Sequence, residues 1–147
     1  MRQWTVLAWA ALLIGCAPIG PIPGGRLGGS VSAPPESWES LQPYGTLQLE
    51  SRPDAPYSVN VWGAGIGRSF YVACRPDSRW LAHVIENPEV RLRVHGNVYE
   101  LRATRSESAE IRDKFFRQLM EQYGWSPDDR DRESAWLLRL EPRSSSR

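Results

Sequence analysis

The sequence contains little cysteine, little lysine and no long apolar run, and each shortage limits what the protein can be. Two cysteines among 147 residues allow at most one disulfide. Lys114 is the single lysine among 18 basic residues, and the formal net charge is only +1. This balance argues against a nucleic-acid-binding protein, which normally carries a basic excess on one face. The length fits one domain.

The first sixteen residues resemble the export signal of a bacterial lipoprotein. Arg2 gives a positive start, and residues 4–14 form an uncharged apolar stretch. Because a bilayer-spanning helix takes ~20 apolar residues, this stretch fits a signal peptide better than a membrane anchor. It ends in Leu13-Ile14-Gly15-Cys16, which resembles the lipobox, where the cysteine thiol receives diacylglycerol before cleavage. The resemblance predicts a signal peptide over residues 1–15, lipidation at Cys16 and attachment to a bacterial membrane.

Two further features bear on the predicted location. The signal contains no Arg-Arg pair, which favours export of the unfolded chain over export of a folded, cofactor-loaded protein. Ala17 follows the cysteine, where Asp would favour inner-membrane retention by resemblance to Gram-negative lipoproteins. If the host has two membranes, the outer membrane is therefore expected.

Residues 16–43 are predicted to be the lipidated cysteine and a flexible tether. The stretch 17–43 holds six prolines and five glycines. Such a composition buries too little apolar surface to offset the entropy of ordering. Trp38 and Leu41 are the residues expected to dock on the domain at the end of this stretch. The domain itself is expected over residues 44–142, followed by a disordered tail over 143–147.

The remaining sequence predicts six short strands and two helices. Alternating apolar residues indicate strands at 46–50, from 59 to a glycine-rich hairpin loop at 63–67, and at 90–94 and 98–103. A strand at 69–74 is indicated by its aromatic and β-branched residues, and a last strand at 135–140 is nearly apolar on both faces. One helix is expected after Asp77 or Ser78, and a second from a Thr104–Glu107 capping box to Gly124. Short antiparallel strands in the order β-β-β-α-β-β-α-β predict a small, mainly β (α+β) barrel, because closure removes exposed edges.

A two-residue turn is predicted at Gly96-Asn97. It would place Val94 opposite Tyr99 and Leu92 opposite Leu101 on the core face. The same register sets Arg93 opposite Glu100 as a cross-strand ion pair on the other face.

The stretch from Ser69 to Leu101 resembles the split β-barrel superfamily of flavin and deazaflavin oxidoreductases, particularly its deazaflavin-dependent nitroreductase-like members. In those proteins a strand and a short loop lead into a helix patterned Trp-x-x-Asn-Leu-x-x-Asn-Pro. Here the helix reads Trp80-Leu81-Ala82-His83-Val84-Ile85-Glu86-Asn87-Pro88, so its first and last two positions match. His83 and Val84 replace the Asn and Leu of the pattern. The resemblance implies a split barrel.

The resemblance also implies a phosphate-bearing cofactor, FMN or a deazaflavin coenzyme, in a groove at a homodimer interface. The matching phosphate loop, residues 74–79, is shorter than in cofactor-binding members and lacks their Gly and Lys. Arg75 and Arg79 would hold the phosphate, and Ser78 with the first helix amides would complete the cradle. Asp77 opposes an anion site. The alternative interpretation is a helix cap beside two solvated arginines.

Other chemistry-bearing residues give weaker signals. His83 and His95 have no third ligand at metal spacing and so do not predict zinc, although some split-barrel relatives bind haem through a histidine. Cys74 has no internal disulfide partner once Cys16 is lipidated, and no Ser, His and acidic residues show triad spacing. Cys74 is therefore expected to be a buried thiol at a strand end.

Two functions remain open from the sequence, and it does not decide whether the protein is an enzyme. The first is a lipid-anchored, non-catalytic envelope module that binds a small ligand or a partner, with no cofactor. The altered phosphate loop and the export of an unfolded chain favour it. The alternative is a flavin- or deazaflavin-dependent oxidoreductase with His83, Arg75, Ser78 and Arg79 near its cofactor, which the family resemblance favours.

Overall fold

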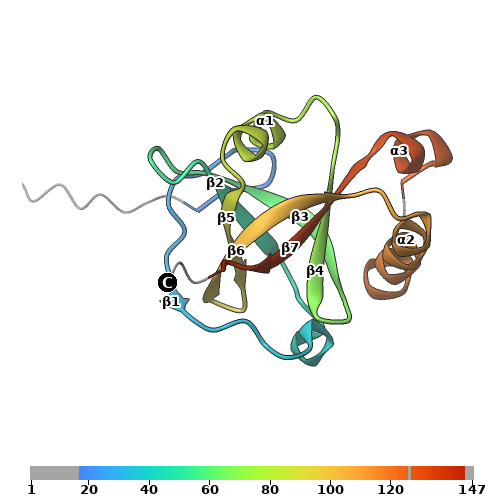
Figure 1. Cartoon of the computed structure of the whole chain (residues 1–147), viewed down its shortest axis with the longest axis horizontal. Helices are drawn as coiled ribbons and strands as arrows, with labels where there is room; N and C mark the ends of the chain where they lie inside the picture. The colour runs from blue at the N-terminus through green and yellow to red at the C-terminus, as the bar shows by residue number, and fades with distance from the viewer. Residues whose placement is uncertain (1–16, 126, 145–147) are drawn as a thin grey trace, which may run out of the picture.

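The computed structural model describes residues 17–125 and 127–144, which form a closed barrel of six antiparallel strands (Figure 1). The barrel strands are β2 (Leu47–Ser51), β3 (Tyr57–Ile66), β4 (Ser69–Cys74), β5 (Glu89–Val94), β6 (Asn97–Ser106) and β7 (Trp136–Pro142). They pair in the order β6-β5-β2-β3-β4-β7, and β7 pairs with β6 to close the circle. A short extra strand, β1 (Ser30–Val31), pairs in parallel with the start of β6. The predicted mainly β barrel is confirmed.

The helices lie around the barrel. α1 (Arg79–Glu86) joins β4 to β5, and a 3-10 turn, η1 (Trp38–Leu41), precedes β2. α2 (Ala109–Tyr123) and α3 (Asp129–Ser134) both lie between β6 and β7 in sequence and sit together beside the barrel in Figure 1. Within the described ranges, no helix is long and apolar enough to cross a membrane.

The barrel interior forms the main hydrophobic core. Val90, Leu92 and Val94 are each fully buried, as their alternation with polar residues predicts. Outside the barrel, α2 packs Phe115, Phe116 and Leu119 against a second cluster formed with Ala64, Tyr71 and Leu137. Ile85 of α1 and Met120 of α2 are apolar but exposed, so they lie outside both cores.

The segment Gly63–Gly67 is not the hairpin loop that the sequence predicts. β3 continues to Ile66, and the turn begins at Gly67, whose φ is 63°. A Cβ atom at Gly63 would lie 2.6 Å from the Phe70 ring, and one at Gly65 would lie 2.4 Å from the Cβ atom of Trp38. The glycines therefore allow large side chains to approach the strand closely.

The turn between β5 and β6 also differs from the prediction. It is formed by His95 and Gly96, with φ angles of 50° and 78°, and Asn97 already pairs with Val94. Leu92 therefore lies opposite Tyr99, a register shift of two residues that leaves the same side chains on the core face. The predicted Arg93–Glu100 pair is wrong, since Arg91 faces Glu100 in the ladder.

The Thr104–Glu107 capping box is wrong as well. Thr104 lies in β6 opposite Arg139, since β7 extends the ladder beyond the predicted end of the strand. α2 begins instead after Ser108, whose side chain accepts a hydrogen bond from the Ile111 amide, and ends as predicted at Gly124. The charged residues before β7 form a short helix, α3, which the sequence-based element order did not include and which the Asp128 carboxylate caps.

The stretch after Ala17 packs on the barrel and does not behave as the tether that its composition predicts. Leu27 is buried, and its amide donates to Glu50 Oε2 at 2.7 Å. Trp38 is fully buried in the core cluster, and Leu41 packs beside it. Backbone and side-chain hydrogen bonds from the barrel supply the ordering energy that apolar composition alone does not. The predicted lipidation site, Cys16, lies outside the described residues, as do the signal peptide and the last three residues of the tail.

Candidate functional site

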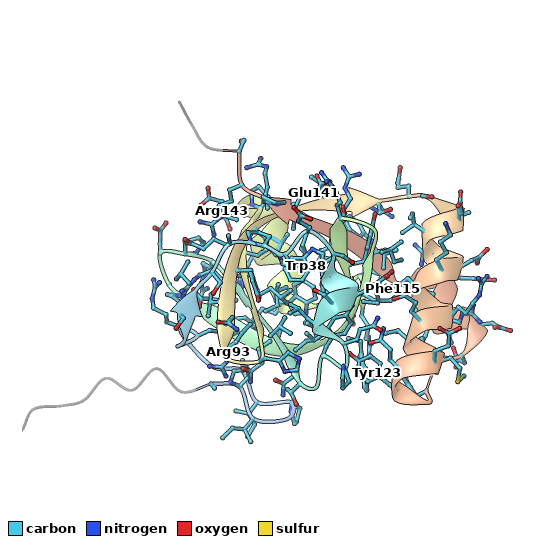
Figure 2. All side chains as sticks on the ribbon, turned by 90° about the horizontal axis from the view of Figure 1, so that it is seen from below. Trp38, Arg93, Phe115, Tyr123, Glu141 and Arg143 are labelled. Carbon is cyan, nitrogen blue, oxygen red and sulfur yellow. The ribbon has the colours of Figure 1, made fainter. Side chains whose placement is uncertain are left out.

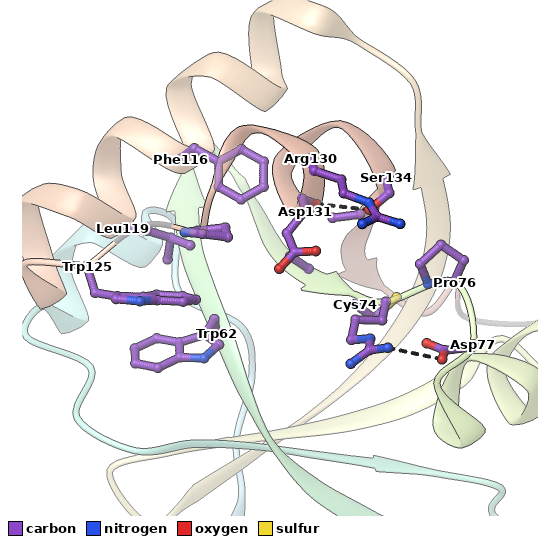
Figure 3. Close-up of a pocket in the computed structure, with 14 residues that line it drawn as sticks. Trp62, Cys74, Pro76, Asp77, Phe116, Leu119, Trp125, Arg130, Asp131 and Ser134 are labelled. Carbon is purple, nitrogen blue, oxygen red and sulfur yellow. Dashed lines mark hydrogen bonds and ion pairs between the residues drawn. The ribbon is translucent and has the colours of Figure 1, made fainter.

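A pocket of about 700 Å³ opens between the barrel and the helices α2 and α3 (Figure 3). Trp62 of β3 and Cys74 of β4 line it from the barrel, and Phe116 and Leu119 line it from α2. α3 supplies Arg130 and Asp131, and the loop between β4 and α1 supplies Arg75 and Asp77. The Arg112 guanidinium fixes the α2–α3 arrangement by donating to the backbone oxygens of Arg132 and Ala135 at 2.7 and 2.9 Å.

An aromatic pair forms one side of the pocket. The rings of Trp62 and Trp125 stack with centroids 5.1 Å apart and planes inclined by 30°. Both side chains are 46% exposed, so a large part of the pair faces solvent. Tyr123 meets Trp62 edge-on at 4.9 Å, and burial raises the pKa of Tyr123 to about 12. The pair therefore offers an uncharged, flat surface that suits an aromatic ring.

The charged side chains around the pocket balance one another. Arg75 and Arg130 are matched by Asp77 and Asp131, and Arg75 contacts the Asp77 carboxylate at 3.2 Å. A phosphate monoester carries about −1.5 to −2 charge at pH 7, so it needs a local excess of positive charge. Since Asp77 and Asp131 offset Arg75 and Arg130, the pocket offers no net positive charge to the phosphate of a flavin mononucleotide or a deazaflavin coenzyme.

Cys74 lies at the base of the pocket as a protonated thiol. Burial raises its pKa to about 12, and its Sγ lies 3.8 Å from the backbone oxygen of Trp136. A thiol in this state is a poor nucleophile, because the thiolate is the reactive form. The sequence-based expectation of a buried thiol is confirmed.

The four residues predicted to hold a cofactor lie on the β4–α1 loop and on α1. Arg75 lines the pocket, whereas Ser78, Arg79 and His83 belong to the cap and body of α1 and do not line it. Ser78 occupies the N-cap position without a side-chain capping bond.

His83 faces the turn between β2 and β3. Its ring lies 3.3 Å from Ser51 Oγ, 3.4 Å from the Arg52 guanidinium and edge-on to Tyr57 at 5.0 Å. Desolvation, with Arg52 and Arg79 nearby, lowers the pKa of His83. His95, at the β5–β6 turn, contacts the Leu41 backbone oxygen at 2.8 Å through Nε2. In the part of the chain with described coordinates, no three His, Cys, Asp or Glu side chains gather as a metal site.

Arg91 and Arg93, which face outward from β5, are engaged by the N-terminal segment. Arg91 pairs with the buried Glu50 at 3.2 Å and donates to the Leu27 backbone oxygen. Arg93 donates to Gln48 and to the Gly28 backbone oxygen. They hold the chain and do not line the candidate pocket.

Sequence reasoning missed Trp62, Trp125 and the α3 residues of this site. Trp62 carried a signal, because it falls on the face opposite Val59 and Val61 in an alternating strand. No feature of the neighbouring sequence indicates its contact with Trp125. Trp125 lies 63 positions away in the chain, and the packing of α2 brings it to Trp62.

Comparisons with known proteins identify the fold. No family model matches the chain, and no curated protein matches its sequence. A general stress protein 26 from Bacillus anthracis is 22% identical with a TM-score of 0.55, covering 69% of this chain and 82% of its own. An FAD-binding protein from Mesorhizobium loti is 18% identical with a TM-score of 0.56, covering 71% and 85%.

The haem storage protein HutZ from Vibrio cholerae is 17% identical with a TM-score of 0.57, covering 73% of this chain and 87% of that one. At these identities the likeness establishes the split β-barrel fold that the sequence predicted. It does not transfer a ligand, since one fold hosts many functions.

Proposed function

We propose that the protein is an exported, lipid-anchored split-barrel module that binds a flat, uncharged ligand without catalysing a reaction. The observation that carries this proposal is the pocket between the barrel and α2–α3, where the Trp62–Trp125 pair lies beside charges that cancel. An uncharged ring that stacks on the aromatic pair is bound favourably, whereas the paired charges exert no net attraction on a phosphate.

The chemistry of the pocket supports binding rather than catalysis. Its one thiol, Cys74, is held protonated by burial. Tyr123 is a neutral phenol at physiological pH. Neither group suits general acid–base catalysis near neutral pH, because an efficient catalytic group has a pKa close to the working pH.

The sequence supports the anchoring half of the proposal. The apolar segment followed by Leu13-Ile14-Gly15-Cys16 resembles the signal at whose cysteine a bacterial lipoprotein is acylated. An exported chain of this kind folds outside the cytoplasm, where a ligand must be acquired from the envelope.

Titration with two flavins tests the binding half, because riboflavin and flavin mononucleotide differ only in the phosphate. We expect riboflavin to quench the tryptophan fluorescence at least as strongly as flavin mononucleotide, and Trp62→Ala to weaken riboflavin binding about tenfold. The control, Arg75→Ala with Arg79→Ala, is expected to leave both affinities and the stability nearly unchanged. Micromolar binding of flavin mononucleotide alone, lost in that control, would overturn the proposal.

The second candidate is a flavin- or deazaflavin-dependent oxidoreductase with its cofactor in a homodimer groove. The FAD-binding neighbour with the same fold favours it. The cofactor would supply hydride chemistry, and Arg75 would be the residue from this pocket to reach its phosphate. This candidate predicts a dimer whose stability rises with flavin mononucleotide, which sedimentation analysis with and without the nucleotide would detect.

A further inference from the structure

The described chain begins with a small apolar hairpin. Ile19 and Ile22 exchange two backbone hydrogen bonds, at 3.0 and 2.9 Å, across Gly20-Pro21. Their side chains are 72% and 64% exposed, and residues 17–25 contain no polar or charged side chain. The hairpin therefore presents an apolar tip to its surroundings.

The barrel holds this hairpin in a fixed place. The Gln48 side-chain amide donates to the Pro18 backbone oxygen at 3.4 Å, and the Asn60 amide donates to that of Gly20 at 3.2 Å. Gly24 and Ser58 exchange two further backbone bonds, at 2.8 and 2.9 Å. These contacts keep Ile19 and Ile22 from folding back onto the core.

Aromatic side chains lie on the same side of the barrel. Gly20, Trp62 and Tyr123 line one surface hollow of about 510 Å³. In Figure 2 the blue hairpin and Tyr123 both lie toward the lower edge of the barrel. Tryptophan and tyrosine concentrate where a membrane surface meets water, because their rings have an apolar body and a polar edge.

The position of Cys16 in the sequence indicates that this face of the protein meets a membrane. Cys16 precedes the pinned Pro18 by two residues in the sequence, and an extended residue spans only ~3.3–3.6 Å. We propose that the apolar tip, Ile19 and Ile22, docks on the membrane that holds the acyl chains. The inference rests on the lipid anchoring proposed above. It predicts a domain in direct contact with the bilayer, whereas a flexible tether would let the domain move freely away from it.

Two nitroxide labels, read in the acylated protein, test this docking. The full-length protein carrying Ile22→Cys is purified from membranes, reconstituted in phosphatidylcholine–phosphatidylglycerol vesicles and labelled at the new cysteine, since Cys74 is buried. The matched control is Ile85→Cys on α1, a residue of the same type with 65% exposure. We expect the Ile22 label to be reached by oxygen more than by a water-soluble nickel chelate, about 5–10 Å into the interface, and the Ile85 label to be aqueous.

The outcomes separate anchoring from docking when the intact mass is measured on the same sample. Acylated protein with an immersed Ile22 label supports the inference. Acylated protein with both labels aqueous overturns docking and leaves anchoring intact. Protein without acyl chains overturns anchoring, and the inference fails with it.

A label-free measurement guards against immersion caused by the nitroxide itself. Brominated lipids quench only tryptophans close to the bilayer, and the acylated parent protein is expected to be quenched through Trp62 and Trp125. Ile19→Asp with Ile22→Asp should reduce this quenching at least twofold, while Ile85→Asp should not. Equal quenching in the two variants, or none in the parent, would contradict docking through the tip.

Discussion

Trp38 illustrates at the residue scale how the N-terminal segment becomes part of the core. Its ring meets Phe70 and Tyr99 edge-on at 5.1 and 5.0 Å, and its side chain is fully buried. Gly65 makes this possible, because any larger residue would collide with Trp38 and with the Tyr44 hydroxyl. The sequence shows a tryptophan and glycines at these positions, but only the fold shows that they fit one another.

Replacing Trp38 tests this packing. Trp38→Ala leaves a cavity in the closed barrel, and such changes cost ~3–5 kcal/mol of unfolding free energy. Trp62→Ala, on the surface, should cost about 1 kcal/mol or less. Urea denaturation of both variants measures the difference, and equal losses would contradict the assignment of Trp38 to the core.

Cys74 gives a second residue-scale prediction. Because burial raises its pKa to about 12, almost none of the thiol is ionised at pH 8. Iodoacetamide should therefore modify the native protein at least tenfold more slowly than the urea-unfolded chain, as followed by intact mass. Rapid native alkylation would mean that the thiol is open to solvent.

At the scale of elements, the sequence predicted the strands whose positions depend on local residue patterns and on the residues of the neighbouring turns. The strand over 69–74 agrees in both bounds because aromatic and β-branched residues mark it between clear turns. β5 agrees within one residue because its apolar and polar residues alternate. The β5–β6 register shifted by two residues because His95, a non-glycine, takes a positive φ in the turn. The packing of residues 17–43 was not predictable from composition, since it depends on Glu50, Gln48 and Asn60 holding the backbone of that segment.

Truncation measures the contribution of that segment. A chain starting at residue 17 should unfold cooperatively, whereas one starting at residue 40 loses Leu27 and Trp38 and leaves Glu50 without the Leu27 amide. We expect the shorter chain to melt at least 10 °C lower or to aggregate, since losing a large core side chain costs several kcal/mol. Circular dichroism melts of the two chains decide it, and equal melting temperatures would restore the flexible-tether interpretation.

At the scale of the whole molecule, the fold and the site carry different information. Proteins described as FAD-binding and as haem-storing share this fold at 18% and 17% identity, so the barrel does not choose a ligand. Of the candidate site, the sequence singled out Arg75 as a ligand-binding residue and expected its neighbour Cys74 only as a buried thiol. It missed the Trp62–Trp125 pair and the balance of Arg130 with Asp131, because α2 and α3 bring these residues together over long sequence separations.

The visible absorption spectrum of the full-length protein, purified from the membranes of its own host, shows whether the protein carries a flavin or haem cofactor. Flavin and haem each absorb visible light strongly, and a protein that had bound either cofactor tightly would carry it through purification. The account predicts a protein whose intact mass includes the acyl chains of Cys16 and whose spectrum shows neither group at stoichiometric level. A stoichiometric flavin band that is lost with Arg75→Ala and Arg79→Ala would contradict the account and identify a phosphate-binding oxidoreductase.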